Sequence, residues 1–339
     1  MIKGRWKKFL SALMIGTMVC SLAGCAKGQG EKEQVILRMT HTQQPDSISD
    51  ITAKEFKKEI EKKSDGRIKV EIYQNCGLSG GDLTKAIELV QAGNIDIHAC
   101  APANIANYDP RFYAFWLPFL FDSTEDMVKF VNNEKVKKEV NGWCNDLEMS
   151  MLGINNAGAR QISSNKKITS PEDLKGMNIR VPGANIFIDL YRKYFKANPT
   201  AMDFSEVYTS LQQGTIDGQE NPIAVFNSSK FSEVQSHILM WDGVRDTNIW
   251  VISNKTLNKL SDEDAKLVQD CASDALEWGN EYLAENESDI VEQLKKQGVE
   301  VDELTDDEKE AFKEACSGIY DEYADVVGQD VIDLFRGQK

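Results

Sequence analysis

An arginine and an asparagine stand where each can reach one small anion. Arg180 lies in a short apolar segment, residues 178–181, that ends at Pro182, and a proline cannot donate the hydrogen bond that continues a strand. Asn221 directly precedes Pro222, which biases its backbone toward an extended conformation. A buried guanidinium is costly without a partner, and a carboxylate matches it with two parallel hydrogen bonds. The partner of Arg180 is therefore either an Asp or Glu of this chain, which the strand alone favours, or an anionic ligand.

Other candidate binding residues lie near predicted strand ends. Arg160 follows the apolar segment 149–154, where the alternative role is a surface ion pair. Phe204 precedes a helical pattern and is either a core residue or the wall of a pocket. Loop residues suited to ligand hydroxyl groups, each alternatively bonded only within its own loop, are His41, Thr42, Asn104, Asp242 and Arg245.

Strand and helix patterns alternate along the chain and predict the frame that holds these residues. Residues 35–39 and 67–73 have strand patterns, whereas 51–63 and 83–90 each have one apolar helical face. Strands separated by helices indicate a largely parallel sheet. The chain also exceeds the size at which a single core keeps growing, which predicts two lobes.

A joint of helix, glycine and strand occurs twice. Residues 90–96, VQAGNID, and residues 211–217, LQQGTID, each end a helix at a glycine, and a polar loop follows shortly after. In open α/β sheets ligands bind beyond the carboxyl ends of the strands, so two facing lobes of this kind form a cleft. We therefore expect an α/β fold of two lobes with the ligand between them. The expected lobes are residues 35–157 with about 247–286, and residues 158–246 with about 287–339.

A long helix is expected near the end of the chain. Residues 261–264, SDED, form a capping box, and a helical apolar pattern continues from there to about residue 297. At 1.5 Å per residue such a helix is roughly 50 Å long, too long for one lobe. We expect it to bridge both lobes.

The segments around Arg180 and Asn221 resemble the signature of the extracytoplasmic solute receptors of tripartite ATP-independent periplasmic (TRAP) transporters, the DctP family. The matching motifs are Arg180, ANPT at 197–200, FSEVY at 204–208, GQENP at 218–222, LPFLF at 117–121, GAR at 158–160 and SPEDLKG at 170–176. The resemblance implies a two-lobe periplasmic-binding-protein fold with a lobe-bridging helix, and a membrane transporter as partner. It also implies that Arg180 clamps a ligand carboxylate, Arg160 supports it, and Asn221 and Phe204 complete the pocket.

Two departures from the family pattern affect the expected substrate. Gly183 stands three positions after Arg180, where the family often has a polar residue, so a bulkier ligand or a water fits there. The loop 241–246 is also unlike the common versions. A sugar acid such as a uronate or aldonate is our first expectation. A four-carbon dicarboxylate, for which Arg245 is the visible second cation, a sialic acid, and a ligand-binding module of a sensory system are the alternatives.

Catalytic and cofactor motifs are missing from the sequence. The chain has three histidines and no HExxH, nucleophile-elbow, Walker or dinucleotide-binding pattern, and no cysteines at metal-ligand spacing. We therefore expect no enzyme activity, no cofactor and no metal site.

The first residues carry a targeting signal. Basic residues within 1–8 precede an apolar run that ends in LAGC at 22–25, which resembles a lipoprotein signal. We expect a signal peptide at 1–24, lipidation at Cys25, a polar tether at 25–34, and a protein anchored by lipid on the extracytoplasmic face of the cell membrane. An ordinary cleavable signal is the alternative.

Charge and cysteines limit the remaining possibilities. The formal net charge of −15 argues against nucleic acid as a partner, and an acidic ligand then needs a local cationic site. The five cysteines after the predicted lipidation site are expected to be buried free thiols, with a Cys271–Cys316 disulfide as the alternative. They are Cys76, Cys100, Cys144, Cys271 and Cys316.

Overall fold

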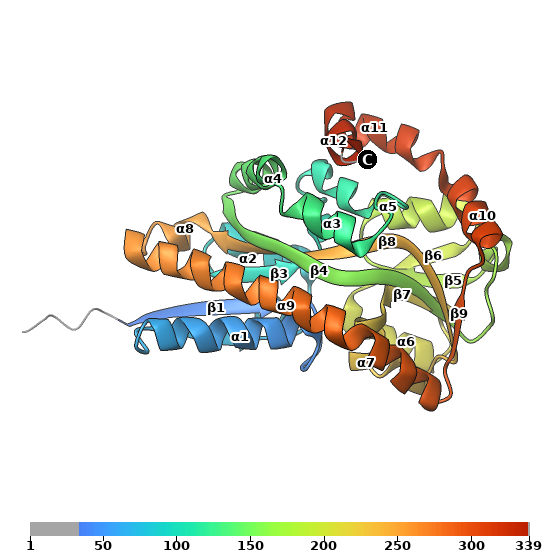
Figure 1. Ribbon diagram of the computed structural model, residues 1–339, viewed down its shortest axis with the longest axis horizontal. Helices are drawn as coiled ribbons and strands as arrows, with labels where there is room; N and C mark the ends of the chain where they lie inside the picture. The colour runs from blue at the N-terminus through green and yellow to red at the C-terminus, as the bar shows by residue number, and fades with distance from the viewer. Residues whose placement is uncertain (1–33, 338–339) are drawn as a thin grey trace, which may run out of the picture. The chain divides into compact units, whose positions relative to one another are not determined.

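One sheet of nine strands runs through the protein (Figure 1). The computed structural model describes residues 34–337, so the predicted signal peptide, Cys25 and all of the predicted tether but Gln34 lie outside the described residues. The strand order is β2-β1-β3-β8-β4-β7-β5-β6, and β9 pairs with β8. The strands are β1 (Val35–His41), β2 (Ile68–Tyr73), β3 (Ile97–Cys100), β4 (Met149–Ser164), β5 (Asn178–Val181), β6 (Asn198–Ala201), β7 (Gly218–Pro222), β8 (His237–Ser253) and β9 (Glu300–Glu303).

The sheet is parallel at its two ends and antiparallel in its centre. Strand β1 is parallel to β2 and β3, and β5 is parallel to β6 and β7, as the alternating pattern predicts. The centre differs from that prediction because β4 and β8, with 16 and 17 residues, pair antiparallel with each other. These two strands carry the chain in opposite directions between the two parallel ends, so both ends belong to one sheet.

Helices cover this sheet, and the longest confirms the predicted bridging helix. Helix α9 begins after Ser261, whose hydroxyl accepts a hydrogen bond from the Asp264 amide, and it contacts α1, β4, α7 and β9 (Figure 1). None of the helices within residues 34–337 is long and apolar enough to cross a membrane. The helices are α1 (Ile48–Lys63), α2 (Leu83–Gln91), α3 (Thr124–Val131), α4 (Glu134–Asp146), α5 (Asn185–Asp189), α6 (Val207–Gln212), α7 (Ile223–Ser228), α8 (Asn254–Leu257), α9 (Asp262–Lys296), α10 (Asp306–Cys316), α11 (Ile319–Val327) and α12 (Gln329–Arg336).

The repeated joint has the same backbone geometry in both places. Gly93 after α2 and Gly214 after α6 have φ angles of +76° and +67°, a left-handed conformation that glycine adopts at little cost. The strands that follow, β3 and β7, begin about two residues later than the Ile-Asp pair suggests. Strand β3 leads into the predicted polar loop, whereas the polar residues after Gly214 form strand β7 itself, which ends at Pro222.

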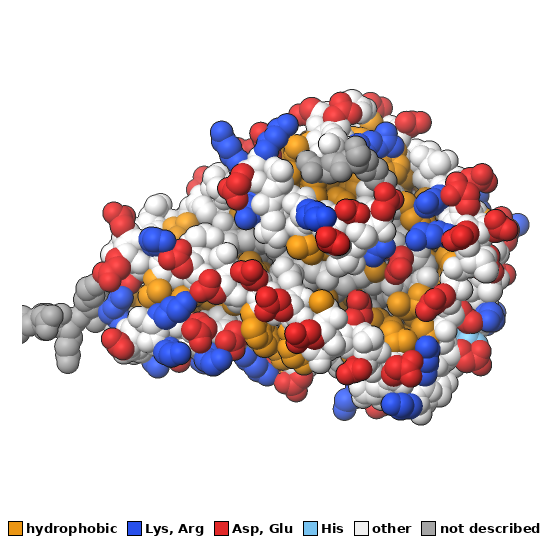
Figure 2. All heavy atoms as spheres, in the orientation of Figure 1, with side chains coloured by type: hydrophobic (Ala, Val, Ile, Leu, Met, Phe, Trp, Pro, Cys, Tyr) orange, Lys and Arg blue, Asp and Glu red, His pale blue; other side chains and the backbone are white. Residues whose placement is uncertain are grey.

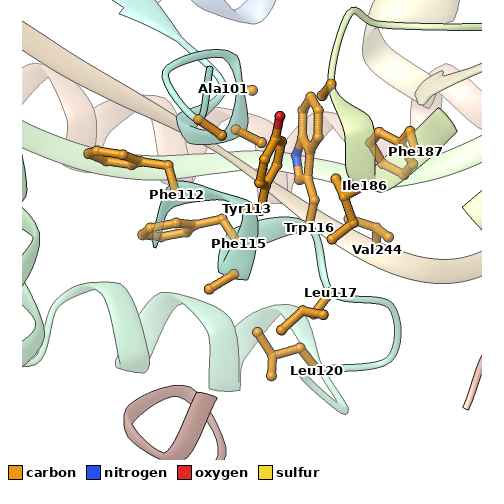
Figure 3. Close-up of a cluster of buried hydrophobic side chains, with 14 of the residues drawn as sticks. Ala101, Phe112, Tyr113, Phe115, Trp116, Leu117, Leu120, Ile186, Phe187 and Val244 are labelled. Atoms are coloured by element: carbon orange, nitrogen blue, oxygen red, sulfur yellow. The ribbon is translucent and has the colours of Figure 1, made fainter. Parts of the chain in front are cut away.

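The core divides into aromatic and aliphatic clusters on the faces of the sheet. In the largest, Trp116 lies 4.6 Å from Phe187 between ring centroids, and both belong to the group drawn in Figure 3. A second cluster packs Phe56 edge-on against Trp250 under α1 and α9. The five cysteines within the described residues are free and buried, which confirms the expectation of free thiols, and no Cys271–Cys316 disulfide is formed.

The surface carries charges of both signs. On the face shown in Figure 2, Asp and Glu side chains lie between Lys and Arg side chains and no large basic patch is present on that face. This face offers no electrostatic track for a nucleic acid backbone.

Candidate functional site

A cavity opens beyond the ends of β1, β3 and β5 and brings together most of the predicted binding residues. It is lined by Arg160, Arg180, Phe204, Asn221, Thr42 and Asn104, all of which the sequence singled out. The sequence reasoning did not single out the remaining lining residues, which are Gln43, Leu83, Ala101, Trp116, Pro182, Pro222, Val225, Asp246 and Asn248. Residues far apart in the chain thus meet at the edge that ligands occupy in α/β sheets.

Arg160 is buried and neutralised by two carboxylates. Its Nε and Nη2 atoms donate to the two carboxylate oxygens of Glu220, and its Nη1 donates to Asp246 Oδ2 at 2.5 Å. The guanidinium carbon lies 5.0 Å from the ring centroid of Trp116. Burial alone would lower the pKa of Arg160, but Glu220 and Asp246 raise it above its usual value. Arg160 is therefore already paired before any ligand arrives.

Arg180 is buried to the same degree but has no carboxylate partner within residues 34–337. It is 2% exposed, and its Nε and Nη2 atoms donate to the Met202 carbonyl at 3.1 and 2.8 Å. Its Nη1 atom donates to no described residue, and its guanidinium carbon lies 5.8 Å from the Phe204 ring centroid. Burial, together with the nearby positive charge of Arg160, lowers the pKa of Arg180 to about 10, against the attraction of Glu220 and Asp203. The structure therefore does not realise the structural salt bridge that the strand alone favoured.

Asn221 is oriented by a chain of buried hydrogen bonds. Its Oδ1 atom accepts from Arg160 Nη2 at 3.2 Å, and its Nδ2 atom donates to Gln219 Oε1 at 2.5 Å. Gln219 donates in turn to the Ser163 hydroxyl at 2.8 Å, which donates to Gln235 Oε1 at 2.9 Å. The second N–H of the Asn221 amide has no partner within the described residues, so it is available at the cavity.

Two predicted ligand contacts, His41 at the end of β1 and Gly183 after β5, are absent from the cavity lining. The His41 ring is fully buried, with Nε2 3.3 Å from Asp50 Oδ1 and with Nδ1 accepting from the Gln43 amide at 3.3 Å. Gly183 offers its carbonyl to the side-chain amide of Asn107 at 3.3 Å. His41 lies behind the lining because β1 turns its ring toward the N-terminal end of α1.

The predicted contacts on β8 also lie elsewhere. Asp242 accepts a hydrogen bond from Gln161 Nε2 at 2.6 Å, and it is absent from the lining. Arg245 donates to the Asp122 carbonyl at 3.0 Å and to the Thr124 hydroxyl at 3.2 Å. The residue expected as a second cation for a dicarboxylate is thus turned toward the loop before α3.

Some of the lining residues that the sequence analysis did not predict could have been recognised from their residue type and their position in a strand. Asp246 and Asn248 are polar residues buried within β8, a position where an unexplained polar side chain points to a site. Trp116 ends an aromatic run and gave no such signal, because aromatic residues most often fill a core. Glu220, which lies between Gln219 and Asn221 in the GQENP motif, accepts hydrogen bonds from Arg160.

Carboxylates that could hold a metal lie away from this cavity. Within residues 34–337, His237, Glu300 and Asp302 have ligand atoms within 4.8 Å of one another, where β9 pairs with β8. Lys167 already pairs with Asp302 at 2.5 Å. The cavity itself presents an unpaired guanidinium, which suits an anion rather than a cation.

Comparison with known proteins agrees with this geometry. The family model for "Bacterial extracellular solute-binding protein, family 7" (DctP) matches residues 39–325. The chain is 30% identical over 289 residues to the sialic acid-binding periplasmic protein SiaP of Vibrio cholerae, covering 84% of this chain and 87% of the relative. It is also 30% identical over 295 residues to the 2,3-diketo-L-gulonate-binding periplasmic protein YiaO of Escherichia coli, covering 87% and 84%.

Solved structures share the fold. The TRAP periplasmic solute-binding protein of Polaromonas sp. JS666, bound to D-erythronate, superposes with a TM-score of 0.83 at 30% identity, over 89% of this chain and 98% of that chain. The corresponding protein of Haemophilus influenzae, with bound L-gulonate, gives 0.84 at 28% identity over 90% and 100%. These relatives are extracytoplasmic solute-binding proteins and not enzymes. The chain therefore belongs to family 7 of the bacterial extracellular solute-binding proteins, the solute receptors of TRAP transporters.

Proposed function

We propose that this receptor binds a sugar acid, such as a uronate or an aldonate, and delivers it to the membrane subunits of a TRAP transporter. The observation that carries the proposal is Arg180, a buried guanidinium with no carboxylate partner in the described chain, facing a cavity. A ligand carboxylate satisfies it with charge-assisted hydrogen bonds. Asn221 then donates its free N–H to the same carboxylate or to an adjacent hydroxyl, and Phe204 forms the wall beside them.

The charge balance of the cavity favours one carboxylate rather than two. Glu220 and Asp246 already neutralise Arg160, so Arg180 is the lining cation left for a ligand. Arg245 is held at the loop before α3 by its hydrogen bonds. A second carboxylate would therefore be desolvated without a cation, which is costly. This disfavours a four-carbon dicarboxylate.

The opposite wall of the cavity suits hydroxyl groups. The side chains of Thr42 and Asn104 line it and make no hydrogen bond within residues 34–337, and Gln43 and Asn248 add neutral polar atoms. Neutral polar atoms beside a single free cation in the described lining favour a hydroxy acid with one carboxylate. The D-erythronate and L-gulonate bound to similar proteins have this chemistry.

The residues that line the cavity come from two lobes, and this division explains how a ligand would be captured. We assign residues 35–157 with about 247–286 to one lobe, and residues 158–246 with about 287–339 to the other. Thr42 and Asn104 then belong to one lobe and Arg180 to the other, and all three line the cavity. A ligand that contacts both lobes stabilises their closed arrangement, and the transporter would recognise that form.

Membrane attachment completes the proposed role. We propose that Cys25 is diacylated and becomes the N-terminus when residues 1–24 are removed, which keeps the receptor on the extracytoplasmic face of the membrane. Radiolabelled palmitate should enter the native protein and should not enter a Cys25→Ser variant. Release of the native protein from membranes by high salt alone would contradict the anchor, because acyl chains are held by the hydrophobic effect rather than by charge.

A thermal-shift screen tests the ligand class. Purified, ligand-free protein is melted with D-galacturonate, L-gulonate, D-erythronate, succinate or sialic acid. At a hundredfold excess over Kd, a ligand adds about 2.7 kcal/mol of stability, which a melting curve resolves. We expect the hydroxy monoacids to shift Tm and succinate to have little effect. Arg180→Met should abolish the shift, whereas the matched Arg245→Met should keep it. A larger shift with succinate than with any sugar acid would overturn the sugar-acid assignment.

A further inference from the structure

We propose that His41 is a positioning residue for the ligand cavity: it does not touch the ligand, but its Nδ1 atom holds the Gln43 amide and so fixes the loop that carries Thr42 and Gln43. This role rests on the function proposed above. His41 is the last residue of β1, and the loop that follows it supplies two lining residues of the cavity. The ring is fully buried and lies outside the lining.

The hydrogen bonds of the ring specify one tautomer. The Gln43 amide donates to His41 Nδ1 at 3.3 Å, so Nδ1 carries no proton. The proton of the neutral ring is then on Nε2, which lies 3.3 Å from Asp50 Oδ1 and donates to it. His41 therefore links a carboxylate at the N-terminal end of α1 to a backbone amide in the cavity wall.

Gln43 has other anchors, but none of them replaces this one. Its carbonyl accepts from the Asn75 amide at 3.1 Å, and its side-chain Oε1 accepts from the Ser49 amide at 3.4 Å. These bonds hold the far side of the residue. The hydrogen bond to His41 is the one that fixes the Gln43 N–H, and with it the peptide unit shared with Thr42.

Charged and titratable groups surround the His41 ring. Helix α1 supplies Asp50, which also accepts from Lys54 at 2.7 Å and from the Asp46 amide at 2.8 Å. Burial alone would raise the pKa of Asp50, but the hydrogen bonds from His41 and Lys54 lower it well below its usual value. Strand β3 supplies His98, whose Nδ1 lies 3.2 Å from the Thr40 carbonyl and whose pKa burial lowers to about 4. Asp50 thus stays ionised, and His98 stays neutral above about pH 4.

Two substitutions separate the roles of the two ring nitrogens. In His41→Asn the amide oxygen reaches the place of Nδ1 and keeps an acceptor for Gln43, whereas in His41→Gln the amide nitrogen reaches the place of Nε2 and keeps only the donor to Asp50. With L-gulonate or D-galacturonate as the probe, we expect affinity within about twofold of native for His41→Asn and about tenfold weaker for His41→Gln.

Hydrogen exchange provides a readout that needs no ligand. The Gln43 amide should stay protected in the native protein and in His41→Asn, and should exchange about tenfold faster in His41→Gln. Unchanged amide protection and unchanged affinity in His41→Gln would overturn the proposal. Equal losses of affinity in His41→Asn and His41→Gln would also overturn it if both variants have the melting temperature of the native protein. If neither acid binds the native protein, the proposed function fails, while the exchange measurement still decides whether His41 holds the loop.

Discussion

Arg160 and Arg180 are the same side chain in two opposite situations. Both are buried beside one cavity, and each guanidinium lies over an aromatic ring. Arg160 is paired with Glu220 and Asp246, whereas Arg180 has a single backbone carbonyl as its partner in the described chain. The pKa of Arg160 is accordingly raised and that of Arg180 lowered. Burial is thus common to both arginines, and the absence of an internal counter-charge within the described residues is what distinguishes Arg180 as the proposed partner of the ligand.

The largest effect should come from removing the paired arginine. Arg160→Met leaves Glu220 and Asp246 buried without a cation, so we expect the free energy of unfolding to fall by about 3–5 kcal/mol. Urea denaturation followed by circular dichroism measures this loss. Adding Glu220→Gln and Asp246→Asn to the same chain should recover part of the stability. An Arg160→Met protein as stable as the native one would show that the ion triad does not support the fold.

Removing the unpaired arginine should affect binding and leave the fold intact. Arg180→Met takes away the proposed partner of the ligand carboxylate, so we expect affinity for the sugar acid to fall at least about thirtyfold, or about 2–5 kcal/mol. The free energy of unfolding should stay the same or rise, because a desolvated charge is lost. Calorimetric titration and denaturation measure the two quantities. Arg180→Lys, which keeps the charge but loses the planar fork, should bind with intermediate affinity. A loss of stability as large as that of Arg160→Met would remove the distinction between the two residues.

Alkaline pH should weaken binding through Arg180 alone. Its pKa in the free protein is about 10, below the usual 12.5, because burial disfavours the charged form. A bound carboxylate favours that form, so binding takes up a proton once the free site is deprotonated. Affinity should be constant below about pH 10 and fall up to tenfold per pH unit above it. The free protein shows the opposite sign for this group, since the unfolded state binds more protons between pH 10 and 12.5 and stability rises there. Titration from pH 8 to 11 tests this, and constant affinity to pH 11 would contradict it.

Short sequence patterns predicted those parts of the fold and of the site that depend on residues close together in the chain. The capping box at Ser261 located the start of α9, and the glycines at 93 and 214 marked both helix ends. The family motifs identified the family and four residues of the cavity lining, and the positions that follow predicted strands gave Thr42 and Asn104. Each of these signals lies within a few residues of the feature that it predicts.

The partners of the arginines depend on contacts between distant residues. Glu220 and Asp246 lie 60 and 86 positions after Arg160, and only the pairing of β4 with β7 and β8 brings them together. The same pairing explains why Arg245, a predicted ligand contact, does not line the cavity. Irregular register between β4 and β8 near Arg160 sets which β8 side chains face the cavity, and Arg245 is turned away. A strand register of this kind has no local signature, so no single segment could reveal which arginine is free.

The smallest expected effect concerns the ring beside Arg180. The guanidinium carbon lies 5.8 Å from the Phe204 ring centroid, and a cation–π contact of this kind contributes about 0.5–1 kcal/mol. Phe204→Leu keeps an apolar wall but loses the ring face, so we expect affinity to fall roughly twofold to fivefold. Phe226→Leu is the matched control, because Phe226 packs against Phe231 as Phe204 does and makes no contact with Arg180 in the described structure. It should lower stability and leave affinity unchanged. Equal affinity losses in the two variants would mean that Phe204 acts only through packing, and that Arg180 binds its ligand without help from the ring.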